Sequence, residues 1–397
     1  MIYLNNAATT WPKPDIVYDT IYEAVRNPFA TLRSSSPDAP RGEDALGFFR
    51  KEISSFFNIS DPGSLVFTPG CTYSLNMAVS GLPWKNGDRV LISALEHHAV
   101  SRPVRKLVRE RGGSIHISPY SRGFPMNMTW LEDELKKGGV RLVACTMASN
   151  VTGEIVPVKE IVQLAHRYGA WCLVDAAQGA GKLPVNVTEL DCDMLAAPGH
   201  KGLMGPTGVG ILYVKQGIPL HVVFEGGTGG DSGKHAMSDT LPNSFEVGTN
   251  NVFAIAGLTA GVQWVQSHFS EIVKKEQFLL NYLVGGLEDI KQIEILGSKD
   301  LKNHIAVVSF VCESMKPGDL GTVLATRYEI TTRAGYHCAP LAHQSIRTLP
   351  GDGTLRISPG YFNTTEEIDI LLHALQKISY SENFLFRRLR HLWMVNC

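Results

Sequence analysis

Lys201 and Asp175 are the two residues of this chain whose setting most clearly favours chemistry. Lys201 lies in the glycine-flanked run Pro198-Gly-His-Lys-Gly202, and Asp175 ends the β-rich run Ala170–Asp175. A lysine in such a turn is as readily a solvated surface residue. An acid at the carboxyl end of a buried strand, however, lies where α/β proteins bind ligands, and its desolvation is costly without a partner. A protonated pyridine nitrogen would be such a partner, so an aspartate with a Schiff-base lysine indicates a pyridoxal-phosphate site.

A candidate anion site follows the strand predicted at Ser64–Thr68. The run Thr68-Pro-Gly-Cys-Thr-Tyr-Ser74 is predicted to open a helix, so free backbone N–H groups and the helix dipole would face a phosphate. An ordinary capped loop explains the same pattern equally well. The run Gly179-Ala-Gly-Lys182 is not a P-loop, because it lacks the upstream glycine spacing and the following serine or threonine.

The neighbouring histidines of Glu96-His97-His98 suggest two readings. A zinc site is disfavoured because the chain offers neither an HExxH pattern nor a CxxC pair here. A ring stacked on a flat cofactor is the competing role for His97, and His98 fits a structural histidine. We therefore expect no metal.

Cys338 differs from the other cysteines in its surroundings. It lies beside His337 and near Arg333, in a loop bounded by Gly335 and Pro340. Nearby cationic groups favour the thiolate, which is the nucleophilic form of cysteine. An inert thiol is the alternative.

Arg356 stands in the alternating run Leu355-Arg-Ile-Ser358. Its guanidinium could clamp a substrate carboxylate through two hydrogen bonds. A surface salt bridge is the alternative.

Composition excludes several classes of protein. The 397 residues include 37 basic and 38 acidic side chains, and 44% of them are apolar. The net charge of −1 offers no electrostatic reason to expect nucleic acid or a membrane surface as a partner. No secretory signal is visible at the amino terminus. Seven cysteines without a CxxC pair favour reduced thiols in the cytoplasm over a disulfide framework.

The periodicity predicts a mostly parallel sheet covered on both faces by helices, because β-rich runs alternate with amphipathic stretches. The predicted strands are Ser64–Thr68, Arg89–Ser93, Ser114–Ser118, Arg141–Thr146, Ala170–Asp175, Asp193–Ala197 and Val209–Val214. After a helix around Ala254–Lys275 the pattern predicts a smaller unit. Its predicted elements are a strand at Ile305–Val311 and helices at Gly318–Tyr328 and Glu366–Ile378.

Taken together and in this order, the motifs resemble those of the cysteine desulfurases in the class V aminotransferase family. The resemblance runs from Leu4-Asn-Asn-Ala-Ala-Thr-Thr10 to Asn363-Thr-Thr-Glu-Glu-Ile-Asp369. It implies an α/β fold-type I pyridoxal-phosphate transferase, with a seven-stranded, mostly parallel sheet sandwiched by helices and a smaller α+β carboxyl-terminal domain. The expected boundaries are 16–258 for the large domain, 1–15 with 259–380 for the small domain, and 381–397 for a tail.

The resemblance also implies roles for the residues around the cofactor ring. Lys201 corresponds to the lysine that holds pyridoxal 5'-phosphate, and Asp175 to the partner of the pyridinium nitrogen. Gln178 would contact the ring hydroxyl, and His97 would stack on the ring and help to move protons. Asn150 matches an asparagine near both substrate and cofactor.

The phosphate positions of the family match Thr72 and His200, with backbone help from Cys71. Thr249 matches a residue that reaches the phosphate of the neighbouring subunit, so the resemblance implies a homodimer. One position departs from the pattern. The family usually has a serine two residues before the histidine, where this chain has Pro198, which offers neither a hydroxyl nor an N–H.

For the substrate, the resemblance implies that Arg356 binds the carboxylate and that Cys338 forms the persulfide. The reaction expected is conversion of L-cysteine to L-alanine, with transfer of the sulfur to an acceptor protein. The compact Cys338-Ala-Pro340 loop is similar to that of the short-loop group, which also shows selenocysteine lyase activity. The alternatives are a selenocysteine lyase, another class V lyase or transaminase, and, from a different class, a non-catalytic α/β binding protein.

Overall fold

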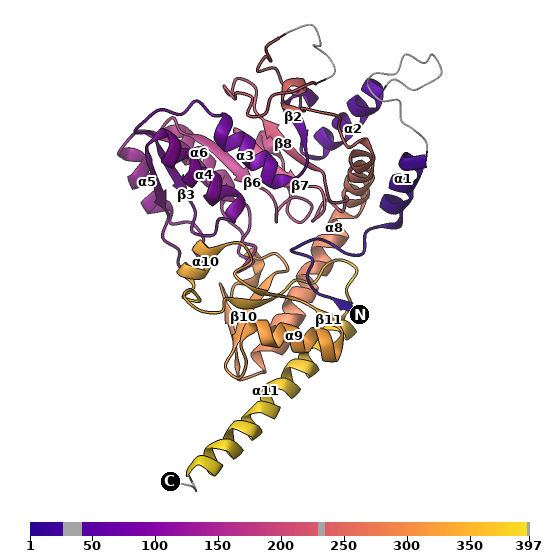
Figure 1. Cartoon of the computed structure of the whole chain (residues 1–397), viewed down its shortest axis with the longest axis vertical. Coiled ribbons are helices and arrows are strands. Elements are labelled where there is room, and N and C mark those ends of the chain that lie inside the picture. The colour runs from indigo at the N-terminus through magenta and orange to yellow at the C-terminus, as the bar shows by residue number, and fades with distance from the viewer. Residues whose placement is uncertain (27–41, 229–234, 395–397) are drawn as a thin grey trace.

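The computed structural model describes residues 1–26, 42–228 and 235–394, and its centre is a seven-stranded sheet with the order β2-β8-β7-β6-β5-β3-β4 (Figure 1). Neighbouring strands from β7 to β4 run parallel, whereas β8 is antiparallel to both β7 and β2. The strands are β2 (Leu65–Thr68), β3 (Arg89–Ile92), β4 (Ser114–Ile117), β5 (Val140–Thr146), β6 (Trp171–Asp175), β7 (Met194–Pro198) and β8 (Gly210–Val214). The predicted mostly parallel sheet is confirmed, and each predicted strand lies within one or two residues of an observed one.

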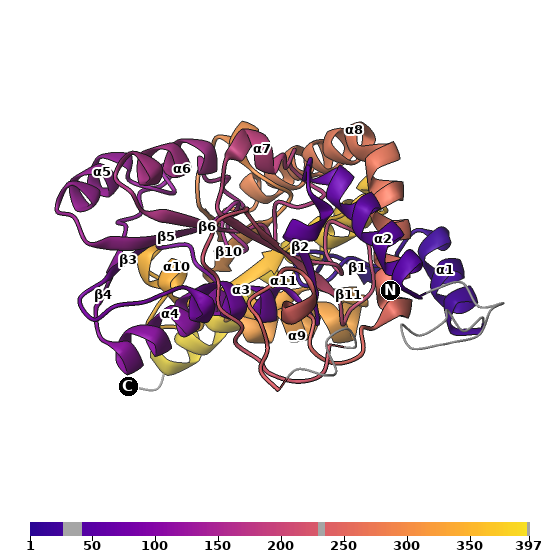
Figure 2. The same ribbon diagram turned by 90° about the horizontal axis from the view of Figure 1, so that it is seen from above.

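Two layers of helices cover the sheet, one on each face (Figure 2). The helices on one face are α3 (Cys71–Gly81) and α4 (His98–Arg111). The other face is covered by α2 (Gly42–Phe56), α5 (Met128–Lys136), α6 (Val158–Arg167) and the first part of α8 (Val252–Glu288). The short helix α7 (Val187–Leu190) also lies on this second side. Because both faces are buried, the central strands are almost continuously apolar, as β6 and β7 show.

The smaller unit is built on a four-stranded antiparallel sheet with the order β12-β13-β10-β9. Its core includes Leu283, Phe310, Leu324, Ile357 and Leu371. The remaining elements are β1 (Ile2–Tyr3), α1 (Asp15–Arg26), β9 (Ile293–Leu296), β10 (Val308–Cys312), α9 (Pro317–Tyr328), β11 (Ile330–Thr331), β12 (Arg333–Gly335), α10 (Pro340–Ser345), β13 (Thr354–Ile357) and α11 (Thr365–Met394).

Two sequence predictions for this unit differ from the structure. The strand predicted from Ile305 begins only at Val308, because the backbone turns tightly where Val307 N donates to Ile305 O at 2.7 Å. The helix predicted to close at Ile378 continues as α11 to Met394 and extends away from the body of the molecule (Figure 1). The predicted tail from 381 is therefore helical as far as Met394, and residues 395–397 lie outside the described part of the chain.

The two units are connected by the amino-terminal segment and by α8. Strand β1 pairs in parallel with β11, after which the chain crosses to the large sheet and forms α1 against α8. Helix α8 is continuous over 37 residues and passes through the predicted boundary at 258/259 without a break. The domain boundaries remain a prediction.

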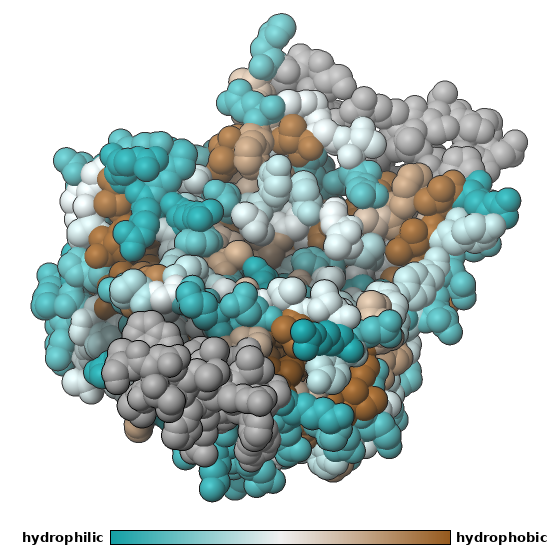
Figure 3. Space-filling model, turned by 60° about the horizontal axis from the view of Figure 1, so that its bottom comes forward, coloured by the Kyte–Doolittle hydropathy of each residue, from teal (hydrophilic) through white to brown (hydrophobic). Residues whose placement is uncertain are grey.

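The surface seen from the side of the small unit is mostly hydrophilic, and its apolar side chains gather in small separate groups (Figure 3). Within the described ranges, none of the helices combines the length and the apolar character that a bilayer span requires.

A buried ion pair fixes one corner of the large sheet. Arg50 on α2 donates to both carboxylate oxygens of Glu246, with N–O distances of 2.6 and 3.0 Å. The same carboxylate accepts from Phe67 N at 2.7 Å and from Asn250 Nδ2 at 2.9 Å. Both charged residues are less than a tenth exposed. The pair therefore ties α2 and β2 to the segment that leads into α8.

We expect Glu246→Ala to lower the free energy of unfolding by about 3 kcal/mol, because it leaves the Arg50 charge buried without its counterion. Urea denaturation followed by circular dichroism measures this. The double variant Arg50→Met/Glu246→Leu should lose less than the single variant, since it removes both charges. Glu288→Ala, at an exposed position of α8, should change stability by no more than about 0.5 kcal/mol. Equal losses in Glu246→Ala and Glu288→Ala would contradict this account.

Candidate active site

A cavity of about 360 Å³ opens at the carboxyl ends of β5, β6 and β7. Parallel strands bring the residues that follow them to one edge of the sheet, which is where α/β folds bind ligands. Many of the predicted site residues line this cavity, namely Cys71, Thr72, His97, Asn150, Asp175, Gln178, His200 and Lys201. The structure therefore brings together residues that lie up to 130 positions apart, from 71 to 201.

Asp175 is the buried acid of the cavity. Its Oδ1 accepts a hydrogen bond from Ala177 N at 2.9 Å and lies 3.7 Å from the Cys71 Sγ donor. Burial raises the pKa of the carboxyl, while the Ala177 N–H and the Lys201 charge oppose the rise. A cationic ring nitrogen would stabilise the carboxylate further, so Asp175 fits the pyridinium partner that the resemblance implies.

Lys201 follows β7 and points into the same cavity as Asp175. Burial lowers the pKa of its amine, and the positive charges of Arg356 and Arg333 lower it further, against the opposing effects of Asp175 and Cys71. A lowered pKa increases the share of neutral amine, which is the form that attacks a carbonyl carbon.

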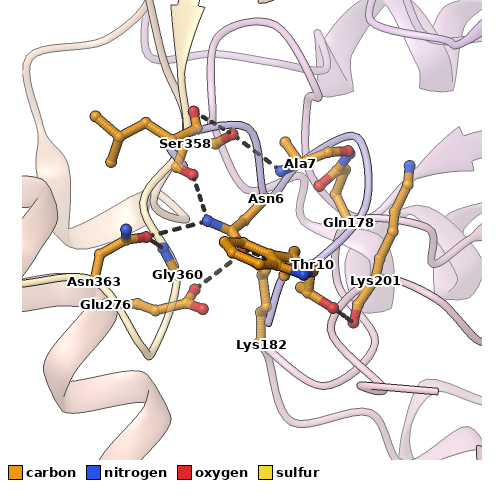
Figure 4. A network of polar contacts seen from close by, with 12 residues as sticks. Asn6, Ala7, Thr10, Gln178, Lys182, Lys201, Glu276, Ser358, Gly360 and Asn363 are labelled. Carbon is orange, nitrogen blue, oxygen red and sulfur yellow. Dashed lines mark hydrogen bonds and ion pairs between the residues drawn. The ribbon is translucent and has the colours of Figure 1, made fainter. Parts of the chain in front are cut away.

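The backbone of the Lys201 loop is held by the amino-terminal segment. Thr9 Oγ1 donates to His200 O at 3.0 Å, and Thr10 Oγ1 donates to Lys201 O at 3.0 Å. Lys13 Nζ donates to His200 O at 2.8 Å. Figure 4 shows Thr10 against Lys201, with the segment continuing past Ala7 to Asn6. Lys13 was not among the predicted site residues, since its role depends on a contact across 187 positions.

The Gly179-Ala-Gly-Lys182 run has a structural role in this fold. Gly181 has a φ of +80°, and a Cβ there would lie 2.1 Å from the carbonyl oxygen of Gly202, the residue after Lys201. Only glycine at position 181 therefore allows its loop to pack this closely against the loop of Gly202. Lys182 Nζ forms a buried ion pair with Glu276 Oε2 on α8 at 2.9 Å (Figure 4).

The predicted phosphate end of the cavity lies at the start of α3. Gly70 precedes the helix without a side-chain cap, so the first N–H groups, at Cys71 and Thr72, have no helical carbonyl before them. His200 Nδ1 is buried without a hydrogen-bond partner in the described structure, and burial with the Lys201 charge lowers the pKa of this histidine to about 4. A neutral imidazole and two free N–H groups are suitable donors for a phosphate.

Pro198 ends β7 and lines the cavity. Because this position borders the cavity, the replacement of the family's serine by proline removes one hydroxyl donor from the predicted phosphate site. Thr207, in the run Gly205-Pro-Thr-Gly208, is an exposed hydroxyl that also lines the cavity. Sequence reasoning missed Thr207, although its turn lies only six residues after Lys201.

Gln178 and His97 are available to a ring. Gln178 Nε2 donates to Ala7 O at 2.9 Å, and its Oε1 is buried without a partner in the described structure, which suits a ring hydroxyl. His97 Nδ1 accepts from Ala99 N at 3.0 Å and caps α4, so the proton of a neutral ring is on Nε2. Burial, with the Lys201 charge adding to it, lowers the pKa of His97 to about 3. The residues present thus fit pyridoxal phosphate.

Arg356 is fully buried on β13 and does not line the cavity itself. Its Nη1 donates to Asn150 O at 2.9 Å and its Nη2 to Asn5 Oδ1 at 3.1 Å, while Nε has no partner in the described structure. Burial, with the neighbouring charge of Arg333, lowers the pKa of Arg356 to about 9. Asn150 Nδ2 in turn donates to His337 O at 2.7 Å, so Asn150 connects Arg356 to the Cys338 loop.

Cys338 is half-buried and lines an adjoining cavity of about 610 Å³, which shares Thr72, His97 and Ala99 with the first. Arg333 Nη2 lies 3.3 Å from its Sγ. His337 and Cys338 both have positive φ, 50° and 60°, a conformation that costs about 1–3 kcal/mol per residue. The strained turn presents the thiol between the cavity and the surface.

Of the two residues noted beside Cys338 in the sequence, His337 does not supply a positive charge. His337 is buried and shares a hydrogen bond of 2.8 Å between its Nε2 and Thr354 Oγ1. Burial and the neighbouring Arg356 lower the pKa of His337 to about 2, so the ring is neutral. The cationic group that contacts the Cys338 thiol is the Arg333 guanidinium.

Thr249 lies apart from the cofactor cavity. It lines a separate cavity of about 410 Å³, which meets the cofactor cavity at Pro69, Tyr73 and Gly208. Its contact with a neighbouring subunit remains a prediction. Over the described ranges, no group of three or more His, Cys, Asp or Glu side chains has the arrangement of a metal site.

Comparison with known proteins gives one consistent family. The model of the family "Aminotransferase class-V" matches residues 2–371. A probable cysteine desulfurase of Methanothermobacter thermautotrophicus is 33% identical over 384 residues, which cover 95% of this chain and 94% of the relative. The cysteine desulfurase of Synechococcus elongatus is also 33% identical, over 95% of this chain and 60% of its own length. The chain thus spans only about 60% of the length of some curated relatives.

Solved structures agree with this match. The apo cysteine desulfurase from Thermococcus onnurineus NA1 superposes with a TM-score of 0.86 at 29% identity, covering 96% of this chain and 95% of that one. The cysteine desulfurase CsdA from Escherichia coli gives a TM-score of 0.82 at 26% identity, covering 95% and 94%. The predicted fold-type I architecture is confirmed. The chain belongs to the class V aminotransferase family, its curated relatives are cysteine desulfurases, and its cofactor is pyridoxal 5'-phosphate.

Proposed function

We propose that this protein is a pyridoxal-phosphate-dependent cysteine desulfurase that converts L-cysteine to L-alanine and takes the sulfur as a persulfide on Cys338. The observation that carries the proposal is the position of the Cys338 thiol, 3.3 Å from a guanidinium nitrogen of Arg333 and beside the cavity of Lys201 and Asp175. The names of the relatives that span nearly this whole chain support the same reaction.

Asp175, Lys201 and Cys338 have separate roles in the proposed reaction. Asp175 holds the protonated ring nitrogen, and the lowered pKa of Lys201 lets its amine take and return a proton at the substrate carbons. When bound, pyridoxal phosphate supplies the electron sink that such proton transfers need. The Cys338 thiolate attacks the substrate sulfur, so that an S–S bond forms and the C–S bond breaks with its electron pair left on carbon.

Arg356 and Asn150 are proposed to bind the substrate. The Arg356 guanidinium is held by Asn150 O and Asn5 Oδ1, and its Nε, which has no partner in the described structure, is among the donors left for a carboxylate. Because Asn150 also bonds the backbone of His337, substrate binding and the Cys338 loop share one hydrogen-bond chain.

The proposal also includes an oligomeric state and a cellular compartment. Thr249 completes the phosphate site of a second copy, so the working unit is a homodimer. The compartment is the cytoplasm, which is supported by the free state of the described cysteines, Cys71, Cys145, Cys172, Cys192, Cys312 and Cys338.

Selenocysteine lyase activity is the second candidate function. Only Ala339 separates Cys338 from Pro340, the first residue of α10. So short a loop matches the group in which that activity also occurs. Comparing rates with cysteine and selenocysteine separates the two activities.

We expect Cys338→Ala to reduce sulfur release from cysteine to the level of the protein-free reaction while leaving the yellow absorbance of the bound cofactor intact. The nucleophile is removed, but no residue of the cofactor cavity changes. Measurements are sulfide and alanine formation, and persulfide mass at each cysteine. Cys312→Ala, a half-buried thiol on β10, is the matched control and should keep full activity. Full activity in Cys338→Ala would refute the assigned role.

We expect Lys201→Ala to lose covalent attachment of the cofactor and Asp175→Asn to keep it. Denaturing mass spectrometry after borohydride reduction detects the attachment. Both variants should reduce turnover, by roughly 10²–10⁴-fold where proton transfer is the function lost. Retained attachment in Lys201→Ala would show that another lysine holds the cofactor. A wild-type chain that never becomes yellow with added cofactor would instead support a non-catalytic protein.

A further inference from the structure

The cavity that reaches Cys338 continues outward as a basic groove. Its walls come from α3, through Thr72 and Asn76, and from the outer face of α4. Four cationic side chains of α4 line it, namely Arg102, Arg105, Lys106 and Arg109. All four are exposed. None of them has a role in the proposed reaction.

The sequence of α4 places these cations in one stripe. Positions 102, 105, 106 and 109 have the spacing i, i+3, i+4, i+7, which aligns side chains on one face of a helix. The opposite face carries Val100, Val104 and Leu107, which are buried in the core against α3. The stripe is therefore fixed toward solvent by the packing of its own helix.

The stripe has few countercharges. Glu110, the single acidic residue of α4, lies 2.6 Å from Lys106 Nζ and 3.8 Å from Arg109 Nη2. Arg102 and Arg105 have no ion-pair partner within the described ranges. A groove lined by one sign of charge raises the local concentration of ligands of the opposite sign.

Helix α4 also holds the nucleophile loop. His98 N, at the first turn of α4, donates to Cys338 O at 2.7 Å. The stripe begins one turn further along, at Arg102, and ends at Arg109, seven residues later, so it is about 10 Å long at ~1.5 Å per residue. That span exceeds a single carboxylate or phosphate, so an extended acidic surface fits it better than a small anion.

We propose that this groove docks an acidic surface of a protein thiol that accepts the sulfur, and so guides that thiol to Cys338. The inference rests on the proposed desulfurase function. In the transfer, the acceptor thiolate attacks the outer sulfur of the Cys338 persulfide. A new S–S bond forms on the acceptor, the old S–S bond breaks, and Cys338 leaves with the electron pair as a thiolate. No net oxidation occurs.

The first experiment measures binding alone, with the holoenzyme and fluorescently labelled probe peptides. The acidic probe carries four glutamates on each side of a serine, and the basic probe carries lysines instead. Arg102→Glu/Arg105→Glu should weaken binding of the acidic probe at least ~10-fold at low salt, and added salt should weaken binding to the wild type. Arg102→Lys/Arg105→Lys should retain binding. The control Lys159→Glu/Arg167→Glu reverses the same number of charges on exposed positions of α6, across the sheet (Figure 2).

The second experiment measures transfer from persulfidated enzyme to the same peptides with cysteine in place of serine. The acidic thiol should accept sulfur at least ~10-fold faster than the basic one, and only Arg102→Glu/Arg105→Glu should remove this preference. Reaction with neutral dithiothreitol should be equal in all variants. Equal behaviour of the acidic and basic peptides, or equal loss in the α6 control, would overturn the proposal. Absence of a Cys338 persulfide would instead refute the desulfurase function, while the binding result would still decide the groove.

Discussion

A buried carboxylate and a half-buried lysine at the carboxyl ends of two neighbouring strands are the constraint on which the rest of the structure depends. Asp175 ends β6 and Lys201 follows the adjacent parallel strand β7, and burial acts against the charged form of each. Mutual attraction offsets part of that cost. The remainder is compensated by the Ala177 N–H, by Cys71 and, when bound, by a cationic ring. The site is thus built to hold a charged heterocycle.

The geometry of this pair depends on segments remote in sequence. The amino-terminal segment donates from Thr9, Thr10 and Lys13 to the backbone of His200 and Lys201. It also reaches the small unit, where Asn6 Nδ2 donates to Ser358 O at 3.1 Å (Figure 4). Asn5, next in the chain, supports Arg356. One short segment therefore aligns Lys201, the proposed cofactor lysine, and Arg356, the proposed substrate arginine.

Cys338, the proposed nucleophile, is positioned by contacts from both units. Cys338 lies on a strained turn of the small unit, yet its carbonyl is bound by the first turn of α4 in the large unit. The thiol therefore stands at the junction of the two units and lines the basic groove, which adjoins the cavity of Asp175 and Lys201 at Thr72, His97 and Ala99. This position suits a sulfur atom that is first received from a substrate and then passed on.

The sequence by itself determined the layered α/β fold, because apolar runs bounded by polar turns directly indicate strands that are buried on both faces of a sheet. It also located Lys201, Asp175, His97 and the start of α3, because each ends or follows a strand whose carboxyl end can be predicted from the apolar pattern. Only the tertiary structure decided the burial of Arg356, the neutral state of His337 and the support from Lys13. These features depend either on contacts between residues more than a hundred positions apart or on the removal of solvent from a charged group. A local sequence pattern contains neither kind of information.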